Sequence, residues 1–301
     1  MILSRRIRSS AVAVVAALMV VGGVVVARPA PSTASSKPVI VAGVSQWGAL
    51  ASSVVGSDAT VVSLLTDPNA DPHNHEATTS DAINVSRATI VIENGAGYDT
   101  WLTKLVQARS GPPVVIDVAR LVGVRTGQNP HVFYSVVAAT RFVGALAADL
   151  KRLGHYPGTQ ARAAATIARL GGLSVRVSQI HHGCAGVKVA ATEDVAGYLL
   201  AAMGLRVVTP EALRLAIGNS VDPSVQDLAL ALSQLRHHPA FLVNNTQTAT
   251  PLTQELVAQA KSSHVPVINV TETMTGTNYV RWMSGVIAAM HGALVREGCV
   301  R

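Results

Sequence analysis

A proline–histidine pair occurs at two places in the chain, each after an apolar run of the kind that forms a strand. His73 follows Pro72, and His131 follows Pro130. The residue before a proline is pushed toward extended geometry, so the strand ends there and the histidine projects from a short, stiff loop. Two such histidines, from two strand ends of one sheet, could meet over the edge of that sheet. They would then form half of a metal site.

Two acidic residues hold comparable positions in the second half of the chain. Glu193 follows the apolar segment 187–191, and Glu272 follows the apolar segment 266–270. Ligands of open α/β sheets bind beyond the carboxyl ends of the strands, and all four candidates lie at such ends. Two carboxylates and two neutral imidazoles would cancel the charge of a divalent cation, which makes a partly buried ion tolerable.

The same residues also fit simpler roles. A single histidine after a proline is more often an ordinary loop residue, and either glutamate could simply cap the helix that follows it. His75 lies near His73 and is a candidate auxiliary ligand. The histidine pairs at 181–182 and 237–238 lie at predicted helix ends, where an imidazole suits the helix dipole. The residues alone therefore leave a metal site and a structural role open.

The elements that must position these residues alternate along the chain. Apolar, β-branched runs predict strands, and longer segments with helical periodicity lie between them. In the first part we expect strands at 39–44, 60–65, 88–92 and 114–116, and helices at 46–55, 98–108 and 135–153, with another helix starting with N-cap chemistry at Ser80. One long helix spans 159–180. The pattern then restarts, with strands at 187–191, 206–208, 241–243 and 266–270, and helices at 195–203, 224–236, 251–263 and 279–295.

This alternation predicts an α/β fold of two lobes, each with a mostly parallel sheet covered by helices, joined by one long helix. We expect a signal peptide and linker at 1–37, an N-terminal lobe at 38–157, a connecting helix at 158–182 and a C-terminal lobe at 183–301.

The N-terminus has the pattern of a targeting segment. Arg5, Arg6 and Arg8 precede an apolar run of 17 residues at 11–27, and a Pro/Ser-rich stretch follows. Cleavage after Ala27 or Ala30 and retention as a membrane anchor are both open, because 17 apolar residues are at the lower limit for a membrane span. Either way we expect an exported protein, in the periplasm or on the outer face of the cytoplasmic membrane.

Composition excludes several classes of protein. The 301 residues are 49% hydrophobic and 14% charged, which is not the composition of a disordered chain. The formal net charge is +7, but four of the arginines belong to the N-terminal segment, so the remainder carries only +3. Without basic clusters interleaved with aromatics, this weak excess does not indicate a nucleic-acid partner.

The chain has only two cysteines, Cys184 and Cys299. Disulfides persist outside the cytoplasm, so the two could pair and tie the C-terminus to the start of the second lobe. Two unpaired small core residues are the other possibility. Their spacing is not that of a zinc-binding cysteine cluster.

Four segments together resemble a known family, the metal-binding solute-binding proteins of bacterial zinc/manganese ABC importers, which have two lobes joined by a rigid helix. The resemblance covers most of 38–301. It rests on the stretch from Asp71-Pro72-His73 through Asn94-Gly95 to Trp101-Leu102, on 129–133, on 192–199, and on Thr271-Glu272 followed by 277–279. No single motif is decisive, but the four occur in the family's order and at comparable spacing.

The resemblance implies a ligand set of His73, His131, Glu193 and Glu272. It also implies the capture of a divalent metal ion, delivery to an ABC permease in the cytoplasmic membrane, and no enzymatic activity; we expect a monomer. Two imidazoles with two carboxylates suit Mn²⁺ or Fe²⁺, whereas Zn²⁺ binds most such sites more tightly. Manganese or zinc is thus the expected cargo, with iron a weaker candidate. The chain lacks the family's long His- and acid-rich loop and the acylation cysteine of many members.

Other functions stay open on sequence grounds. The same scaffold could serve a surface adhesin, or a binding protein for haem or a siderophore. A metallohydrolase would need an open coordination position and a general base beside the bound water. The chain has no HExxH helix and no Asp cluster for a second metal, which disfavours that third function.

Overall fold

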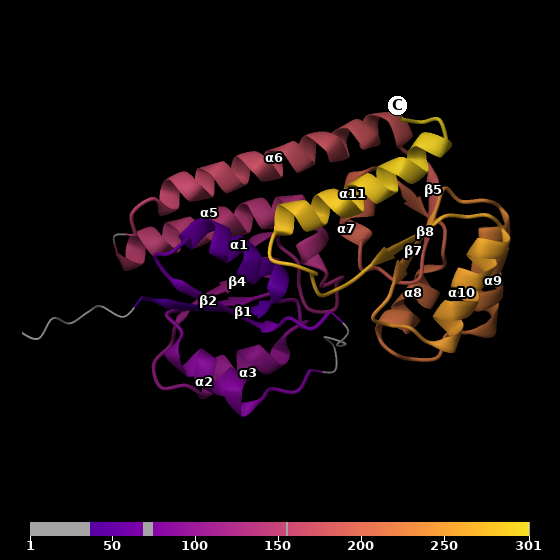
Figure 1. Cartoon of the computed structure of the whole chain (residues 1–301). Helices are drawn as coiled ribbons and strands as arrows, with labels where there is room; N and C mark the ends of the chain where they lie inside the picture. The colour runs from indigo at the N-terminus through magenta and orange to yellow at the C-terminus, as the bar shows by residue number, and fades with distance from the viewer. Residues whose placement is uncertain (1–36, 69–74, 155, 301) are drawn as a thin grey trace, which may run out of the picture. The chain divides into compact units, whose positions relative to one another are not determined.

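The strands predicted from apolar runs form two parallel sheets in the computed structural model, which describes residues 37–68, 75–154 and 156–300 (Figure 1). The N-terminal segment, its cleavage positions and His73 lie outside the described residues. Sheet one contains β1 (Val39–Val44), β2 (Thr60–Leu65), β3 (Ile90–Glu93) and β4 (Val114–Asp117) in the order β2-β1-β3-β4. Sheet two contains β5 (Lys188–Ala191), β6 (Arg206–Val207), β7 (Leu242–Asn245) and β8 (Val267–Val270) in the order β6-β5-β7-β8.

Each sheet is parallel throughout, so the carboxyl ends of its strands share one edge. Strand β1 is central in its sheet and almost fully buried, with Val41 opposite Val62 on one side and Val91 on the other. A parallel sheet needs helices on both faces, which explains why its strands read as unbroken apolar runs. The predicted fold class is confirmed.

Helices connect and cover the strands. In the first half these are α1 (Ser45–Val55), α2 (Thr79–Arg87), α3 (Thr100–Ala108), α4 (Val118–Leu121), the 3-10 turn Val132–Tyr134 and α5 (Val136–Leu153). The long helix α6 (Thr159–Cys184) follows. The second half has α7 (Gly197–Ala202), α8 (Glu211–Gly218), α9 (Val225–Arg236), α10 (Pro251–Ser262) and α11 (Tyr279–Arg296).

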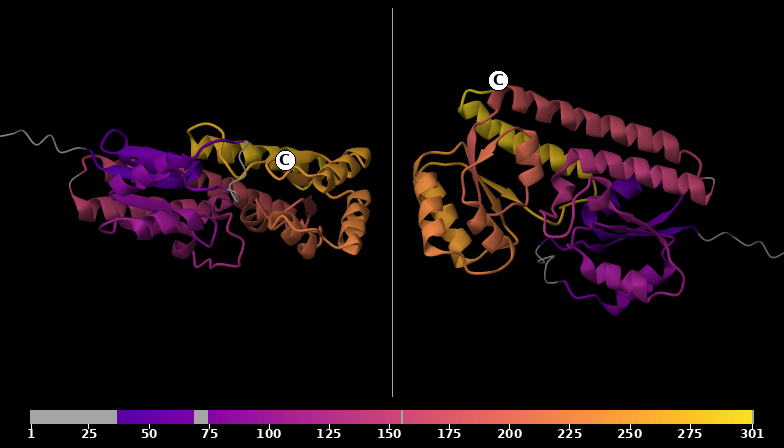
Figure 2. Two further views of the ribbon diagram at one scale, coloured as in Figure 1. Left: turned by 90° about the horizontal axis from the view of Figure 1, so that it is seen from below. Right: turned by 180° about the vertical axis from the view of Figure 1, so that it is seen from behind.

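Helix α6 runs along both halves, and both views in Figure 2 show this arrangement. Its 26 residues span about 39 Å at the usual helical rise. The buried side chains Leu170, Leu173, Val177 and Ile180 recur every three or four residues, which makes one apolar stripe. This stripe packs on α5, α1, α11 and α7, so helices from both halves share it. The largest cluster of buried side chains accordingly contains residues of both halves.

The two cysteines form a disulfide at the far end of α6. Cys184 is the last residue of the helix, and its Cα lies 5.2 Å from that of Cys299. Gly183 allows this approach, because a Cβ there would lie 2.3 Å from the Cys299 carbonyl oxygen. The bond ties the end of the chain to the start of the second half.

Several local expectations differ from the structure. Helix α2 begins at Thr79 rather than Ser80, because Thr78 is the N-cap and forms a capping box with Asp81. Helix α3 begins at Thr100 rather than at residue 98, and helix α6 continues four residues past Ile180, to Cys184. Helices α4 and α8 and the 3-10 turn were not predicted.

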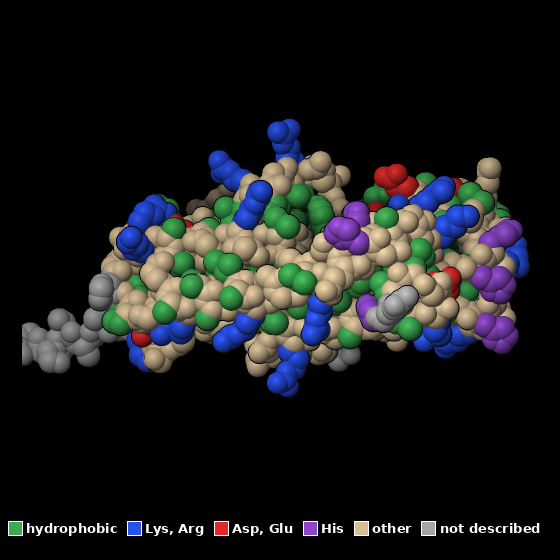
Figure 3. Space-filling view, turned by 90° about the horizontal axis from the view of Figure 1, so that it is seen from above, with side chains coloured by type: hydrophobic (Ala, Val, Ile, Leu, Met, Phe, Trp, Pro, Cys, Tyr) green, Lys and Arg blue, Asp and Glu red, His purple; other side chains and the backbone are tan. Residues whose placement is uncertain are grey.

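Over the described part of the chain, no helix is both long and apolar enough to cross a membrane. On the face along which α6 and α11 run, Lys and Arg side chains lie apart from one another rather than in one patch (Figure 3). Several histidine side chains gather at one end of this face (Figure 3).

Candidate metal centre

Two of the four predicted ligands, His131 and Glu272, are in contact between the strand ends of the two sheets, and Glu193 lies near enough to be affected by both. Among the described residues, no group of three His, Cys, Asp or Glu side chains is already arranged to hold a metal ion. His131 Nε2 lies 3.2 Å from Glu272 Oε2, and the charges of both residues act on Glu193. All three side chains are buried, with exposed fractions of 5% for His131, 2% for Glu193 and 0% for Glu272. The fourth candidate, His73, belongs to the segment 69–74 outside the described residues.

The ring of His131 is oriented by Asn129. The Asn129 side-chain nitrogen donates to the Asp194 carbonyl at 2.8 Å, which turns its oxygen toward His131. That oxygen accepts from the His131 backbone N–H at 3.0 Å and lies 2.7 Å from Nδ1. Nδ1 is therefore assigned as the protonated nitrogen, and Nε2 presents its lone pair to the centre. This is the tautomer that a metal-binding histidine requires.

The carboxylate of Glu272 is fixed from both halves of the chain. Asn245, at the end of β7, donates to Oε1 at 2.8 Å, and the Tyr98 hydroxyl donates to Oε2 at 3.0 Å. The backbone of Glu272 is held as well: its N–H donates to Gln247 at 2.5 Å, and its carbonyl accepts from Gln46 at 2.5 Å. Glu272 does not cap a helix, because Asn278 caps α11. Its position is set before any ion arrives.

Glu193 has a buried oxygen without a hydrogen-bond partner. Oε1 accepts from the Thr248 hydroxyl, whereas Oε2 has no partner among the described residues and lies against Gly218 of α8. Burial, and then the charge of Glu272, raises the pKa of Glu193. A buried carboxylate oxygen without a donor costs free energy unless a cation or proton meets it. Glu193 is not a helix cap either, since α7 begins at Gly197 without a side-chain cap.

The centre opens into a pocket of about 380 Å³ between the halves. His131, Glu193 and Tyr98 line its inner end, and α8 contributes Arg214 and Gly218 on the other side. Arg214 is ion-paired with Asp194, so its charge is already met. The donor set that remains, imidazole nitrogen and carboxylate oxygen, fits a divalent transition metal.

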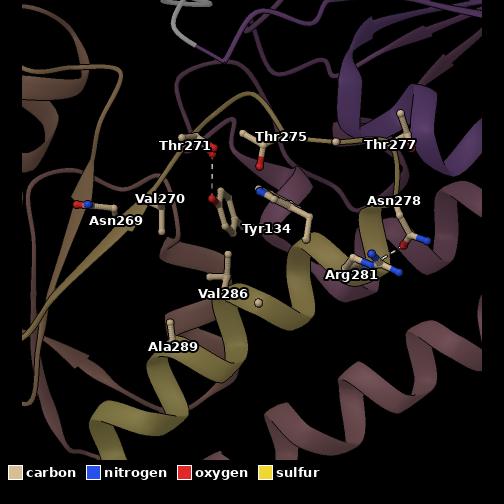
Figure 4. Close-up of a pocket in the computed structure, with 13 residues that line it drawn as sticks. Tyr134, Asn269, Val270, Thr271, Thr275, Thr277, Asn278, Arg281, Val286 and Ala289 are labelled. Atoms are coloured by element: carbon tan, nitrogen blue, oxygen red, sulfur yellow. Dashed lines mark hydrogen bonds between the residues drawn. The ribbon is translucent and has the colours of Figure 1, made fainter.

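A larger groove of about 770 Å³ lies behind the Glu272 loop, along α11 (Figure 4). Tyr134 points across it, and its hydroxyl donates to the Thr271 carbonyl at 2.9 Å. Its lining is mostly hydroxyl, amide and apolar groups with Arg281, and includes no carboxylate or imidazole. The smaller pocket is thus the better cation site.

The contacts of His75 are with residues other than His131, Glu193 and Glu272. Its Nε2 lies 3.3 Å from Asp81 Oδ2, and its ring packs edge-on against Trp101 at 4.4 Å between centroids. These contacts anchor it to α2 and α3.

The residues that hold the candidate ligands in place were not predicted from the sequence. Tyr98, Asn129, Asn245, Gln247 and Thr248 each contact a ligand or its backbone. One signal was available, because the polar run 244–248 begins in the last two residues of β7 and continues beyond it, near the same sheet edge where Glu193 and Glu272 follow β5 and β8. Tyr98 gave no such signal, since its role depends on contact with the other sheet.

A family model described as "Zinc-uptake complex component A periplasmic" (ZnuA) matches residues 40–293. No curated protein matches the chain.

Solved structures share the fold at low sequence identity. The periplasmic zinc-binding protein TroA from Treponema pallidum is 18% identical, with a TM-score of 0.72 over 88% of this chain and 100% of its own. The Mn²⁺ complex of the SBP FpvC from Pseudomonas aeruginosa is 20% identical, with a TM-score of 0.70 over 87% and 100%. A Mn-bound periplasmic metal-binding protein from Candidatus Liberibacter asiaticus is 15% identical, with a TM-score of 0.71 over 86% and 100%. At these identities the structures establish the fold.

Proposed function

Because the chain belongs to the family of the periplasmic component A of the zinc-uptake complex, we propose that it captures a divalent transition metal ion outside the cytoplasm and delivers it to an ABC permease. The observation that carries this proposal is the buried Oε2 of Glu193, which has no donor among the described residues and shares one pocket with His131. Proteins of this family are periplasmic binding proteins rather than enzymes. The family match favours capture over the adhesin, haem or siderophore and metallohydrolase alternatives.

We assign the ligands as His73, His131, Glu193 and Glu272. Support for the last three is the contact between His131 and Glu272, the effect of both charges on Glu193, the burial of all three, and the lone pair that His131 Nε2 presents to the centre. Support for His73 is its sequence position after Pro72, at the carboxyl side of β2 in the same sheet as the strand before His131. The charge of a divalent ion would be matched by the two carboxylates.

Capture involves no bond-breaking beyond proton release. The raised pKa of Glu193 favours a proton on that carboxyl in the metal-free protein. A metal ion replaces this proton, so its binding releases the proton to solvent.

The cargo is manganese or zinc. Relatives with this fold include a zinc-binding protein and complexes with Mn²⁺ and Ni²⁺. Two carboxylates with imidazole favour a harder ion such as Mn²⁺, although Zn²⁺ binds such donor sets more tightly in solution.

For the whole chain, we propose a monomer with lobes at 38–157 and 183–301, connected through 158–182. The segment 1–37 directs export, and either cleavage or retention as an anchor is compatible with capture at the membrane surface.

A titration of the leaderless protein tests the assignment. Wild type, His73→Ala and His131→Ala are titrated with Mn²⁺ and Zn²⁺ by calorimetry near neutral pH, with His291→Ala on α11 as a matched control. Each ligand variant should lose more than about 100-fold in affinity, because even residues that only support ligands change metal affinity 10–100-fold. Equal affinity in His73→Ala would remove that residue from the ligand set.

A further inference from the structure

A half-buried ion pair lines the metal pocket. Asp194 and Arg214 both line this pocket, and their side chains form a direct carboxylate–guanidinium contact. The exposed fractions are 26% for the Asp194 side chain and 13% for that of Arg214, so the pair is not an ordinary surface salt bridge. Screening by salt is weaker for charges buried to this degree.

Both partners have fixed positions. Arg214 is on α8, and its Nε donates to the Thr209 carbonyl at 3.3 Å. Asp194 directly follows Glu193, and its backbone carbonyl accepts from the same Asn129 amide that orients His131. The acid of the pair is therefore tied to two of the proposed ligands.

Arg214 is the one Lys or Arg side chain among the described residues that line this pocket. Two carboxylates line the pocket with it, Glu193 and Asp194. Its guanidinium is bound to Asp194, whereas the buried Oε2 of Glu193 has no hydrogen-bond donor within the described part of the chain. Without Asp194, the guanidinium would have Glu193 as the remaining carboxylate in the pocket and would compete with an incoming cation.

We propose that the Asp194–Arg214 ion pair sets the electrostatic potential at the entrance of the metal site and keeps Arg214 from occupying the Glu193 carboxylate. This inference rests on the proposed function. Both residues are positioning residues rather than ligands. The pair is neutral as a unit, so an incoming divalent ion meets neither a repelling cation nor an extra anion that would slow its release.

Single substitutions should act in opposite directions. Arg214→Gln leaves the charge of Asp194 uncompensated at the entrance, and should speed association of Mn²⁺ about five- to tenfold, with an effect that shrinks as salt rises. Asp194→Asn frees the guanidinium, and should weaken Mn²⁺ affinity at least about tenfold, because a unit positive charge then lies beside the ligand carboxylate.

The experiment measures Mn²⁺ association and dissociation by stopped-flow competition with a fluorescent chelator, at two salt concentrations. It uses the leaderless wild type, the two single variants, the double variant and Arg214→Lys. Arg236→Gln, on the exposed end of α9, is the control for the loss of one positive charge. The double variant should recover most of the affinity lost in Asp194→Asn, and Arg214→Lys should stay near wild type.

The possible outcomes distinguish failure of this inference from failure of the proposed function. Opposite effects of the singles, with recovery in the double variant, support the inference. Wild-type rates in all variants, or equal losses in both singles and in the double variant, overturn it and leave the proposed function intact. Failure of the wild type to bind Mn²⁺ or Zn²⁺ contradicts the proposed function itself. Thermal melts of each apo variant identify any loss that comes from misfolding.

Discussion

Burial of the Glu193 carboxyl costs free energy in the metal-free protein. Its carboxyl is 2% exposed, and burial raises its pKa above the ordinary value. A group whose folded pKa is raised stabilises the fold when protonated, and that contribution is lost as pH rises from the unfolded pKa through the folded one. A metal ion would offset this loss at neutral pH. Metal binding is thus favoured in part because the ion supplies the counter-charge that the buried Glu193 carboxylate lacks.

Glu193→Gln should have two opposite effects. It should raise the melting temperature of the metal-free protein at pH 8, because the amide needs no counter-charge, and it should lower Mn²⁺ affinity more than about 100-fold. Thermal melts and calorimetric titrations check both effects. Glu255→Gln, on the exposed side of α10, should change neither. A less stable metal-free variant with unchanged affinity would contradict the role of Glu193.

Metal affinity should fall as pH falls below neutral. Binding needs Glu193 ionised, and its raised pKa means that protons compete at a higher pH than for an ordinary glutamate. Titrations at pH 8, 7 and 6, each in two buffers of different ionisation enthalpy, should show release of about one proton or more per ion. Affinity independent of pH would count against this account.

Glu93 is a second buried carboxyl, at the end of β3, and lies outside the metal centre. Burial, with a smaller effect from Asp99, raises its pKa to about 7. Stability from its protonated form is therefore present below about pH 4.5 and is lost as pH rises to about 7.

Glu93→Gln should accordingly stabilise the protein by about 1–2 kcal/mol at pH 8, after allowance for solvent near the group. At pH 4.5 the same variant should match wild type. Urea unfolding at both pH values checks the difference, and an equal effect at both would rule out titration of Glu93 as its source.

At the scale of elements, apolar runs predicted every strand to within about two residues, since buried parallel strands are apolar on both faces. Helix ends were harder, because caps such as Thr78 depend on which side chain reaches back to the backbone. Helix α8 was missed because its eight residues show only Leu213 and Ile217 as a buried pair. Yet α8 forms one wall of the metal pocket.

The positions of the candidate ligands at strand ends could be predicted from the sequence, but the contact between His131 and Glu272 could not. Strand ends of one sheet share an edge, which placed Glu193 and Glu272 together from topology alone. Contact between His131 and Glu272, 141 residues apart, depends on how the two halves pack through α6 and α11. No local pattern carries that information. For the same reason, the hydrogen bond from Tyr98 to Glu272 was not predicted.

The disulfide at the end of α6 should contribute to stability without affecting metal binding. It closes a loop with a sequence separation of 115 residues. Cys184→Ala with Cys299→Ala should therefore destabilise the protein by about 2–5 kcal/mol. Denaturant unfolding with and without reductant measures this, and the double variant should not respond to reductant. Unchanged stability, or a large loss of metal affinity, would contradict this division of roles.

At the scale of the whole molecule, the shared core limits how far the halves can separate. Helix α6 packs on helices of both, and hydrogen bonds from Tyr98, Gln46 and Tyr134 join the first half to the loop around Glu272. A stiff connection of this kind permits small shifts rather than a wide hinge.

Small-angle X-ray scattering should therefore give radii of gyration for the metal-free and Mn²⁺-loaded proteins that agree within about 1 Å. A larger contraction on loading would show that the halves open widely when empty. The Glu255→Gln variant, which changes an exposed residue of α10, is the control in this measurement.

We propose that one divalent ion binds in the pocket at His131, Glu193 and Glu272. The most direct test is total-metal analysis of the leaderless protein after competitive loading with Mn²⁺, Zn²⁺ and Fe²⁺ near neutral pH and exhaustive dialysis. We predict about one retained ion per chain, lost in Glu193→Gln. Retention of no ion by the wild type, with the protein folded, would contradict the claim.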